Sequence, residues 1–382
     1  MPLFRASAAR TRILLVVLAV VSLVALFTTR VSRKMPDFEV YWTAGSRALA
    51  GAPLYREEDG HYQFKYLPAF AIAAAPIAKL PLPAAKGFWF AASALLMLAL
   101  LWLSVQAMPE LRRPAPLLVV LTFLAMAKFY AHELVLGQVN MLFGVLAALA
   151  IVWLRAGRDA AAGLLLALAV VVKPYAAIFA PWLATRRHRG GFATMVAAVI
   201  VLLLLPALRY GWEGNLHLLG DWWRTVTATT APNLANPDNV SLSAMFTKWL
   251  GPDSSAPLLA AGLGVLLLAL TGVVVAGRGS LPAPDALEAS MLLLLIPLLS
   301  PQGWDYVFLI ATPGVMLLIN ESSALPRGLS AAALASIAIV GLTIYDLVGR
   351  DVYGTFMRLS IVTVCMVIEF AALAALRFRR AV

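Results

Sequence analysis

The chain has 382 residues, of which 62% are hydrophobic and only 13% are charged, and its mean hydropathy is +0.86. An ordinary soluble domain uses about 45–50% apolar and about 25% charged residues, so the composition excludes that class and indicates an integral membrane protein. The net charge of +11 does not indicate a nucleic-acid partner, because the lysines and arginines form small clusters between apolar runs.

The first predicted element is an apolar helix over residues 13–29. Cations flank it on both sides, and they are Arg5, Arg10, Arg12, Arg30, Arg33 and Lys34. A basic segment before an apolar run resembles a secretory signal, but no cleavage site of small residues follows this run. We therefore interpret the segment as an uncleaved first transmembrane helix.

About twelve apolar runs follow one another along the chain, as expected for a polytopic bundle. They cover 13–29, 87–107, 117–131, 139–154, 160–172, 174–185, 192–208, 256–277, 286–300, 304–319, 328–345 and 358–376. Thirteen helical residues reach roughly 20 Å, less than the roughly 30 Å of the hydrocarbon core, so some runs must be partial or re-entrant. We predict one all-α membrane domain over 1–382, with two large extracytoplasmic loops at 30–86 and 209–255.

Orientation follows from the arginines in the short connections. They are Arg112, Arg113, Arg155, Arg158, Arg186, Arg187, Arg189, Arg278, Arg327, Arg377, Arg379 and Arg380. The positive-inside rule assigns these connections and both termini to the cytoplasm, in a multi-pass protein of the cell (inner) membrane. Residues 160–185 form either one helix kinked at Lys173-Pro174 or a hairpin. The hairpin is favoured because it keeps 186–189 on the cytoplasmic side.

Ionisable groups at the edge of apolar regions then fall on the extracytoplasmic face, and the main ones are Asp37, Lys173 and Asp305. Desolvation makes such groups costly, so they are candidates for function. No nucleotide pool exists on that face, and no nucleotide-binding pattern is present in a usable context. An activated donor must therefore arrive in the membrane, as a lipid-linked phosphosugar does. Its phosphate can be neutralised by Lys173, Arg224 or His132, while a carboxylate takes a proton from the acceptor.

Each candidate also has a purely structural alternative. Asp37 can act as the N-cap of a helix beginning near Phe38, and Lys173 can snorkel to the membrane interface. Aromatic residues flanking the helices are typical interfacial anchors. The four histidines are too dispersed for a metal-binding pattern, and we expect neither a metal nor a cofactor.

Six motifs in a fixed order carry a resemblance to a known family. They are DFxVYWxAGxxxLxGxPLY (37–55), FKYLPAF (64–70), GQVN (137–140), KPY (173–175), NPDNVSLS (236–243) and SPQGWDY (300–306). Together they resemble glycosyltransferase family 87, whose members are polyprenyl-phosphate-mannose-dependent mannosyltransferases with the multispanning GT-C architecture. The resemblance extends over roughly residues 35–310, and it implies a GT-C-type bundle with short helices in the first extracytoplasmic loop.

The resemblance further implies an inverting transfer of a hexose, mannose in this family, from a polyprenyl-phosphate donor to a lipid or envelope-glycan acceptor. Asp37 matches the position of the general base, with Glu39 as the nearby alternative. Further substrate-binding candidates are Glu39, Tyr41, Tyr66, Gln138, Asn140, Trp304 and Asp305. The chain departs from the family where one or two histidines are expected after Asp305, because Tyr306 and Val307 follow. His132 or Lys173 must then assist the departing phosphate.

Two other functions fit a polytopic chain. A lipid or polysaccharide transporter or flippase would distribute polar residues along a path through the membrane, whereas this chain concentrates them at one face. A non-enzymatic assembly partner with a degenerate site would be expected to have lost Asp37. Both features favour the transferase.

Overall fold

The computed structural model describes residues 14, 17–18, 20–186, 188–252, 254–277 and 284–378. Within these ranges the chain is built of helices, and its one β-type pairing is an isolated bridge between Asn239 and Trp304. This confirms the predicted all-α class. Several cations used for orientation lie outside the described residues: Arg5, Arg10, Arg12, Arg187, Arg278, Arg379 and Arg380.

By length and apolar composition, four described helices can cross a membrane, or up to six if each of two bent pairs is one span. The four are α4 (Leu82–Ala107), α5 (Ala115–Leu136), α12 (Ala256–Ala276) and the continuous stretch Asp305–Ala324. The bent pairs join α9 to α10 at 91° and α17 to α18 at 57°. Shorter apolar helices include Val20–Val31, α3, α6, α7 and α15. The complete spans are thus fewer than the apolar runs, as expected because several of those runs are too short to cross the hydrocarbon core.

The remaining elements complete the chain in order. They are η1 (Phe27–Val31), α2 (Pro36–Ala50), η2 (Glu57–Tyr62), α3 (Pro68–Ala78), α6 (Asn140–Arg155), α7 (Asp159–Val172), η3 (Pro174–Ile178), α8 (Phe179–Thr185), α9 (Arg189–Leu204), α10 (Ala207–Thr230), η4 (Ala231–Asn233), α11 (Leu242–Leu250), α13 (Pro284–Leu299), η5 (Asp305–Ala311), α14 (Thr312–Glu321), η6 (Ser322–Ala324), α15 (Arg327–Leu342), α16 (Tyr345–Val348), α17 (Arg350–Arg358) and α18 (Ile361–Arg377).

The centre of the bundle is formed by α13 and the Asp305–Ala324 stretch, whose residues are almost all buried. A helix that is apolar on every side must be surrounded by other helices or by lipid. Around these two, α4, α5 and α12 keep most of their apolar surface exposed, as with Leu258 and Leu266 of α12. That exposed surface fits contact with lipid chains.

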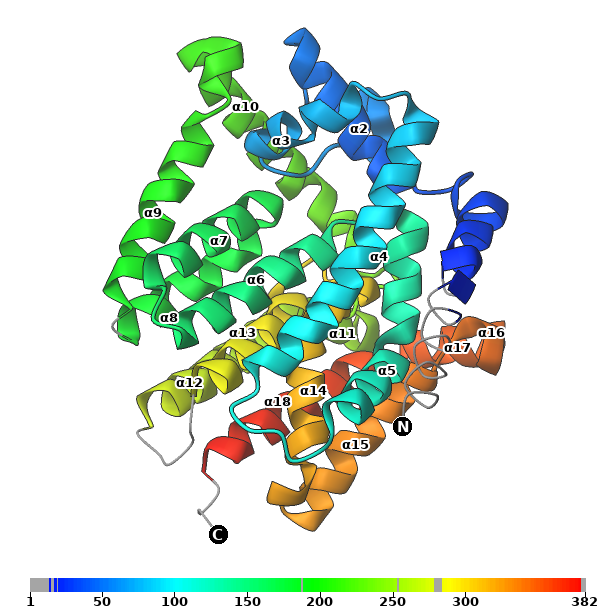
Figure 1. Cartoon of the computed structure of the whole chain (residues 1–382), viewed down its shortest axis with the longest axis vertical. Helices are drawn as coiled ribbons and strands as arrows, with labels where there is room; N and C mark the ends of the chain where they lie inside the picture. The colour runs from blue at the N-terminus through cyan, green and yellow to red at the C-terminus, as the bar shows by residue number, and fades with distance from the viewer. Residues whose placement is uncertain are drawn as a thin grey trace, which may run out of the picture.

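The two ends of the long axis differ in what they hold (Figure 1). At one end lie α2, α3 and the junction of α9 with α10; at the other lie the connections from α4 to α5 and from α14 to α15. Contacts gather the predicted cytoplasmic arginines at the second end. Arg112 pairs with Glu321 at 2.9 Å, and Arg155 donates to the carbonyl oxygens of Gln106 and Met108.

The segment 160–185 folds back on itself. His188, just after α8, lies 3.2 Å from the carboxylate of Asp159 at the start of α7. The chain therefore leaves and re-enters the same end of the bundle, with Lys173-Pro174 at the tip of the turn, as the hairpin interpretation requires. The predicted loop 209–255, by contrast, is mostly helical, because α10 and α11 occupy much of it.

Candidate active site

Asp37 is held where the start of α2 meets the end of α5. Met35 adopts a left-handed conformation (φ 66°), and its amide donates to the carbonyl of Val135 at 3.0 Å. Gly137 ends α5 with φ 69°, and a Cβ there would lie 2.7 Å from the Cβ of Phe38. Only glycine allows both the conformation and this close approach. The junction therefore sets the first turn of α2 directly beside Gln138.

The structure does not support the capping alternative for Asp37. Helix α2 begins at Pro36, its N-cap is Met35, and no side chain caps it. Asp37 is thus inside the first turn, and its carboxylate does not cap the helix. It lines a cavity of about 380 Å³ instead.

The cavity brings together most of the residues predicted from the sequence. Those that line it are Asp37, Tyr41, Tyr66, His132, Gln138, Lys173, Trp304 and Asp305. They come from α2, the 64–70 segment, α5, the turn after it, the tip of the 160–185 hairpin and the 300–306 loop. Residues far apart in the sequence therefore share one small space.

One wall is organised by the side-chain amide of Gln138. Its Oε1 accepts from the hydroxyls of Tyr41 at 2.8 Å and Tyr66 at 3.2 Å, and those two hydroxyls are 2.7 Å apart. Its Nε2 donates to the hydroxyl of Tyr306 at 3.4 Å. A polar network with its members satisfied is rigid, so this wall is preorganised around Asp37.

Asp37 and Lys173 are two ionisable groups of the cavity that form no ion pair with another described residue. Burial raises the pKa of Asp37, and the Gln138 side chain and the Lys173 ammonium partly oppose that rise. Lys173 Nζ lies 6.0 Å from the centre of the Tyr66 ring and makes no hydrogen bond within the part of the chain that the structure describes. Carboxylates of Glu133 and Asp37 attract it from a distance. A half-buried ammonium without hydrogen bonds to the described residues is suited to an anionic ligand.

The opposite wall joins two loops. Val240 N donates to Gly303 O at 2.7 Å, and Asp305 N donates to Asp238 O at 3.0 Å, beside the Asn239–Trp304 bridge. On this framework His132 Nδ1 lies 3.4 Å from Asp305 Oδ1. The Asp305 carboxylate thus holds the imidazole at the edge of the cavity.

Three predicted site residues lie outside the cavity. Glu39 pairs with Lys86 at 2.6 Å, and Arg224 is largely exposed and pairs with Asp221. Asn140 is fully buried and donates to Glu133 Oε2 at 2.8 Å. Asn140 therefore supports the turn after α5 and does not line the cavity.

Sequence analysis missed Glu133 and Asp238. Glu133 is buried, and its carboxylate accepts from Asn140 and from the amide of Met141 at 2.9 Å, which fixes the turn that carries Gln138. Its occurrence inside an apolar helix was a signal that could have identified it. Asp238 lines the cavity, and its pKa is raised by burial and by the nearby Asp305. Nothing in its local sequence indicated that the two aspartates meet.

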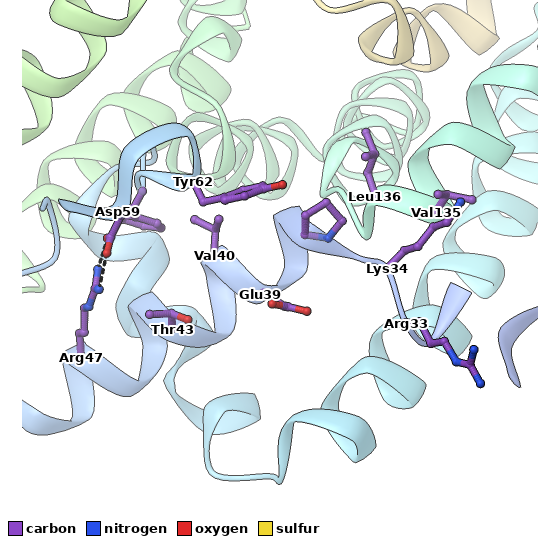
Figure 2. A pocket seen from close by; sticks show the side chains of 12 residues that line it. Arg33, Lys34, Glu39, Val40, Thr43, Arg47, Asp59, Tyr62, Val135 and Leu136 are labelled. Carbon is purple, nitrogen blue, oxygen red and sulfur yellow. Dashed lines mark hydrogen bonds and ion pairs between the residues drawn. The ribbon is translucent and has the colours of Figure 1, made fainter. Parts of the chain in front are cut away.

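Two further cavities adjoin the first. The one in Figure 2 has a volume of about 690 Å³ and follows the other face of α2. Arg33 lies at one end, and the Arg47–Asp59 ion pair, at 2.5 Å, lies at the other (Figure 2). A third cavity of about 1120 Å³ lies along α10. Within the described residues, no group of three or more metal-ligating side chains is present in or outside these cavities.

Comparison with known protein families identifies one match. A model of glycosyltransferase family 87 matches residues 64–301, more than half of the chain. The match begins after Asp37 and includes His132, Gln138, Lys173 and Asp238. No curated protein and no solved structure gives a match. Because the family model matches more than half of the chain, the chain belongs to glycosyltransferase family 87 and is a glycosyltransferase.

Proposed function

We propose that the cavity transfers a hexose, mannose by resemblance to the family, from a polyprenyl-phosphate donor to a hydroxyl of a lipid-borne or envelope-glycan acceptor. The observation that carries the proposal is the joint placement of Asp37 and Lys173 in one cavity, where neither forms an ion pair with another described residue. A carboxylate and a cation in one cavity match the two charge changes of glycosyl transfer from a phosphate.

The reaction is a single displacement. The acceptor hydroxyl oxygen uses a lone pair to attack the anomeric carbon, and the bond from that carbon to the phosphate oxygen breaks. The bonding pair leaves with the phosphate, and the hydroxyl proton passes to Asp37. The products are the inverted glycoside and polyprenyl phosphate, with no redox change.

Asp37 acts as general base in this scheme. A sugar hydroxyl is barely ionised near neutrality, so a base contributes only by accepting the proton as the bond forms, typically about 10²–10⁴-fold. The raised pKa of Asp37 makes its carboxylate a stronger base than an exposed one. Gln138 and the tyrosines bonded to it hold this wall in place while the proton moves.

Lys173 and His132 stabilise the departing phosphate. Lys173 supplies a fixed positive charge, and His132, held by Asp305, supplies a donor at the other side of the cavity. The His132 ring centre is 5.1 Å from that of Tyr306, the residue that stands where the family pattern has a histidine. His132 therefore substitutes for the missing histidine from a neighbouring helix.

The extracytoplasmic location is part of the proposal. It is supported by the position of α2, which carries the cavity residue Asp37 and lies at the end of the bundle opposite the α4–α5 connection that Arg112 and Arg155 contact (Figure 1). Reporter fusions at 113 and 188 are expected to report cytoplasm, and fusions at 60 and 235 the opposite face. A fusion at 60 that reports cytoplasm would refute the lipid-linked donor on the outer face.

Purified protein incubated with radiolabelled polyprenyl-phosphate mannose and a membrane extract tests the activity. Labelled product should form from the lipid donor and not from a nucleotide-linked mannose. Label transferred from the nucleotide sugar, with none from the lipid, would reject the proposed donor.

A further inference from the structure

The third cavity lies next to the catalytic one and shares a wall with it. His61, Gln63 and Lys65 line both spaces. The indole of Trp222 on α10 donates to the carbonyl of Lys65 at 3.2 Å, which fixes that shared wall to the helix. Gln302 Nε2, from the catalytic side, donates to Thr230 Oγ1 at 3.0 Å. The two cavities therefore adjoin each other, and hydrogen bonds fix their shared wall to α10.

The lining of the third cavity is polar and balanced in charge. Its α10 and η4 side contributes Thr225, Thr227, Thr229 and Asn233. The carboxylates of Glu57 and Asp221 offset the cations of Lys65 and Arg224. The Thr227 and Thr229 hydroxyls donate to carbonyls of α10, and their oxygens can still accept hydrogen bonds from a ligand. This surface therefore matches an uncharged ligand rich in hydroxyls.

The cavity in Figure 2 has a different chemistry. Arg33 and Lys34 stand at one end, and the wall beside them is apolar, with Val135 and Leu136 (Figure 2). A cationic end next to apolar side chains suits an anionic lipid headgroup better than a sugar chain. Of the two spaces that adjoin the catalytic cavity, the third one is thus the better match for a glycan.

We infer that the third cavity is the acceptor subsite and holds the sugar residues that precede the glycosylated hydroxyl. The inference rests on the proposed function, because it requires Asp37 to accept that hydroxyl's proton. With its terminal residue in the catalytic cavity, an acceptor passes the shared wall at Gln63 and leaves its remaining sugars against α10. The acceptor is then an oligosaccharide, free or lipid-borne, with at least two sugar residues. Arg224, first considered for the donor phosphate, belongs to this subsite.

The sharpest test fills the cavity without removing a polar group. Ala228 lines it and is exposed, so Ala228→Trp places an indole in the space without disturbing a packed core. Leu216→Trp is the matched control, because Leu216 is on the same helix, is 51% exposed and is not among the residues lining the three cavities. Thr227→Val is a milder second variant that removes one hydroxyl at constant shape.

The measurements distinguish an effect on acceptor binding from an effect on donor binding. Ala228→Trp should raise the KM for membrane-extracted acceptor by about tenfold or more, and Thr227→Val by about threefold, since each lost hydrogen bond weakens binding modestly. The Kd for polyprenyl-phosphate mannose should match the parent in all three variants. An unchanged acceptor KM in Ala228→Trp would overturn the assignment, and so would a selective loss of donor binding.

A binding experiment tests the glycan site without using the proposed donor. Saturation-transfer NMR with an α-linked mannose trisaccharide should give a signal with the parent and with Leu216→Trp, and a weaker one with Ala228→Trp. If the parent fails to use the lipid donor but this pattern holds, the proposed function fails and the glycan site stands. Equal signals from both tryptophan variants, or no signal from the parent, would reject the site.

Discussion

Buried charges in the catalytic cavity differ from those at the opposite end of the bundle, the arginine-rich end. Three ion pairs lie at the arginine-rich end: Arg112 with Glu321, Arg186 with the fully buried Glu288, and His188 with Asp159. Arg377 is the exception there, because its Nε and Nη1 have no hydrogen-bond partner among the described residues. In the catalytic cavity, Lys173 makes no hydrogen bond to the described residues, and Asp37 makes no ion pair with them.

The difference indicates what each set of charges is for. Removing a charge from water is costly, and a close partner offsets part of that cost, so the loss of one partner destabilises the folded chain. The three ion pairs at the arginine-rich end therefore serve the fold. The charges in the cavity remain unbalanced until a ligand enters, so they serve binding and catalysis. Variants at the two ends should consequently fail in different assays.

The largest expected effect is on catalysis. Asp37→Asn removes the base while keeping the shape, and it should lower transfer about 10²–10⁴-fold with folding and donor binding retained. Glu39→Gln, two residues away but paired with Lys86 outside the cavity, should keep most activity. Initial rates with radiolabelled donor check both. If the Glu39 variant loses activity and the Asp37 variant keeps it, then Glu39, and not Asp37, is the general base.

Next in size is a stability effect at the other end. Arg186→Met leaves Glu288 buried and uncompensated, which should cost about 3–5 kcal/mol in the free energy of unfolding. The folded fraction should transfer sugar at the parent rate. Denaturation in detergent, compared with the double variant Arg186→Met/Glu288→Gln, measures this. If the single variant is as stable as the parent but inactive, the division between the two ends is wrong.

Lys173→Met should weaken donor binding about 10- to 100-fold, the usual loss for a hydrogen bond to a charged group. The variant keeps the apolar stem, so a lysine that merely snorkels to the interface would bind donor as the parent does. Lys79→Met, on an exposed position after α3, is the control. Equilibrium binding of labelled donor decides between the two roles.

The smallest expected effect is a shift in the pH profile. Asp37 must be ionised to act as base, so the transfer rate should fall as pH drops through its pKa, which burial raises above the ordinary 3.8. The Lys173 ammonium opposes that rise. Lys173→Met should therefore move the acidic limb of kcat to higher pH. A limb that stays in place or moves to lower pH would show that another group controls the rate.

Several features of the site could be predicted from the sequence alone. The sequence indicates Asp37 and Lys173 as candidates because the desolvation of an ionisable side chain at the edge of an apolar run is costly, so such a side chain is a candidate for function. The conformation of Gly137 and the partnership of Asp238 with Asp305 could not be predicted, since they depend on contacts between distant segments. The sequence pattern predicts a loop around Arg224, whereas the structure places Arg224 on α10, where it lines the third cavity and not the one that Lys173 lines.

The most direct test of the central claim is the anomeric configuration of the product. Parent enzyme would be given polyprenyl-phosphate mannose of one defined anomer, and the new glycosidic bond analysed by proton NMR. A single displacement with Asp37 as base predicts that the product has the opposite configuration to the donor. Retention of configuration would contradict the account, because a single in-line displacement at the anomeric carbon must invert it.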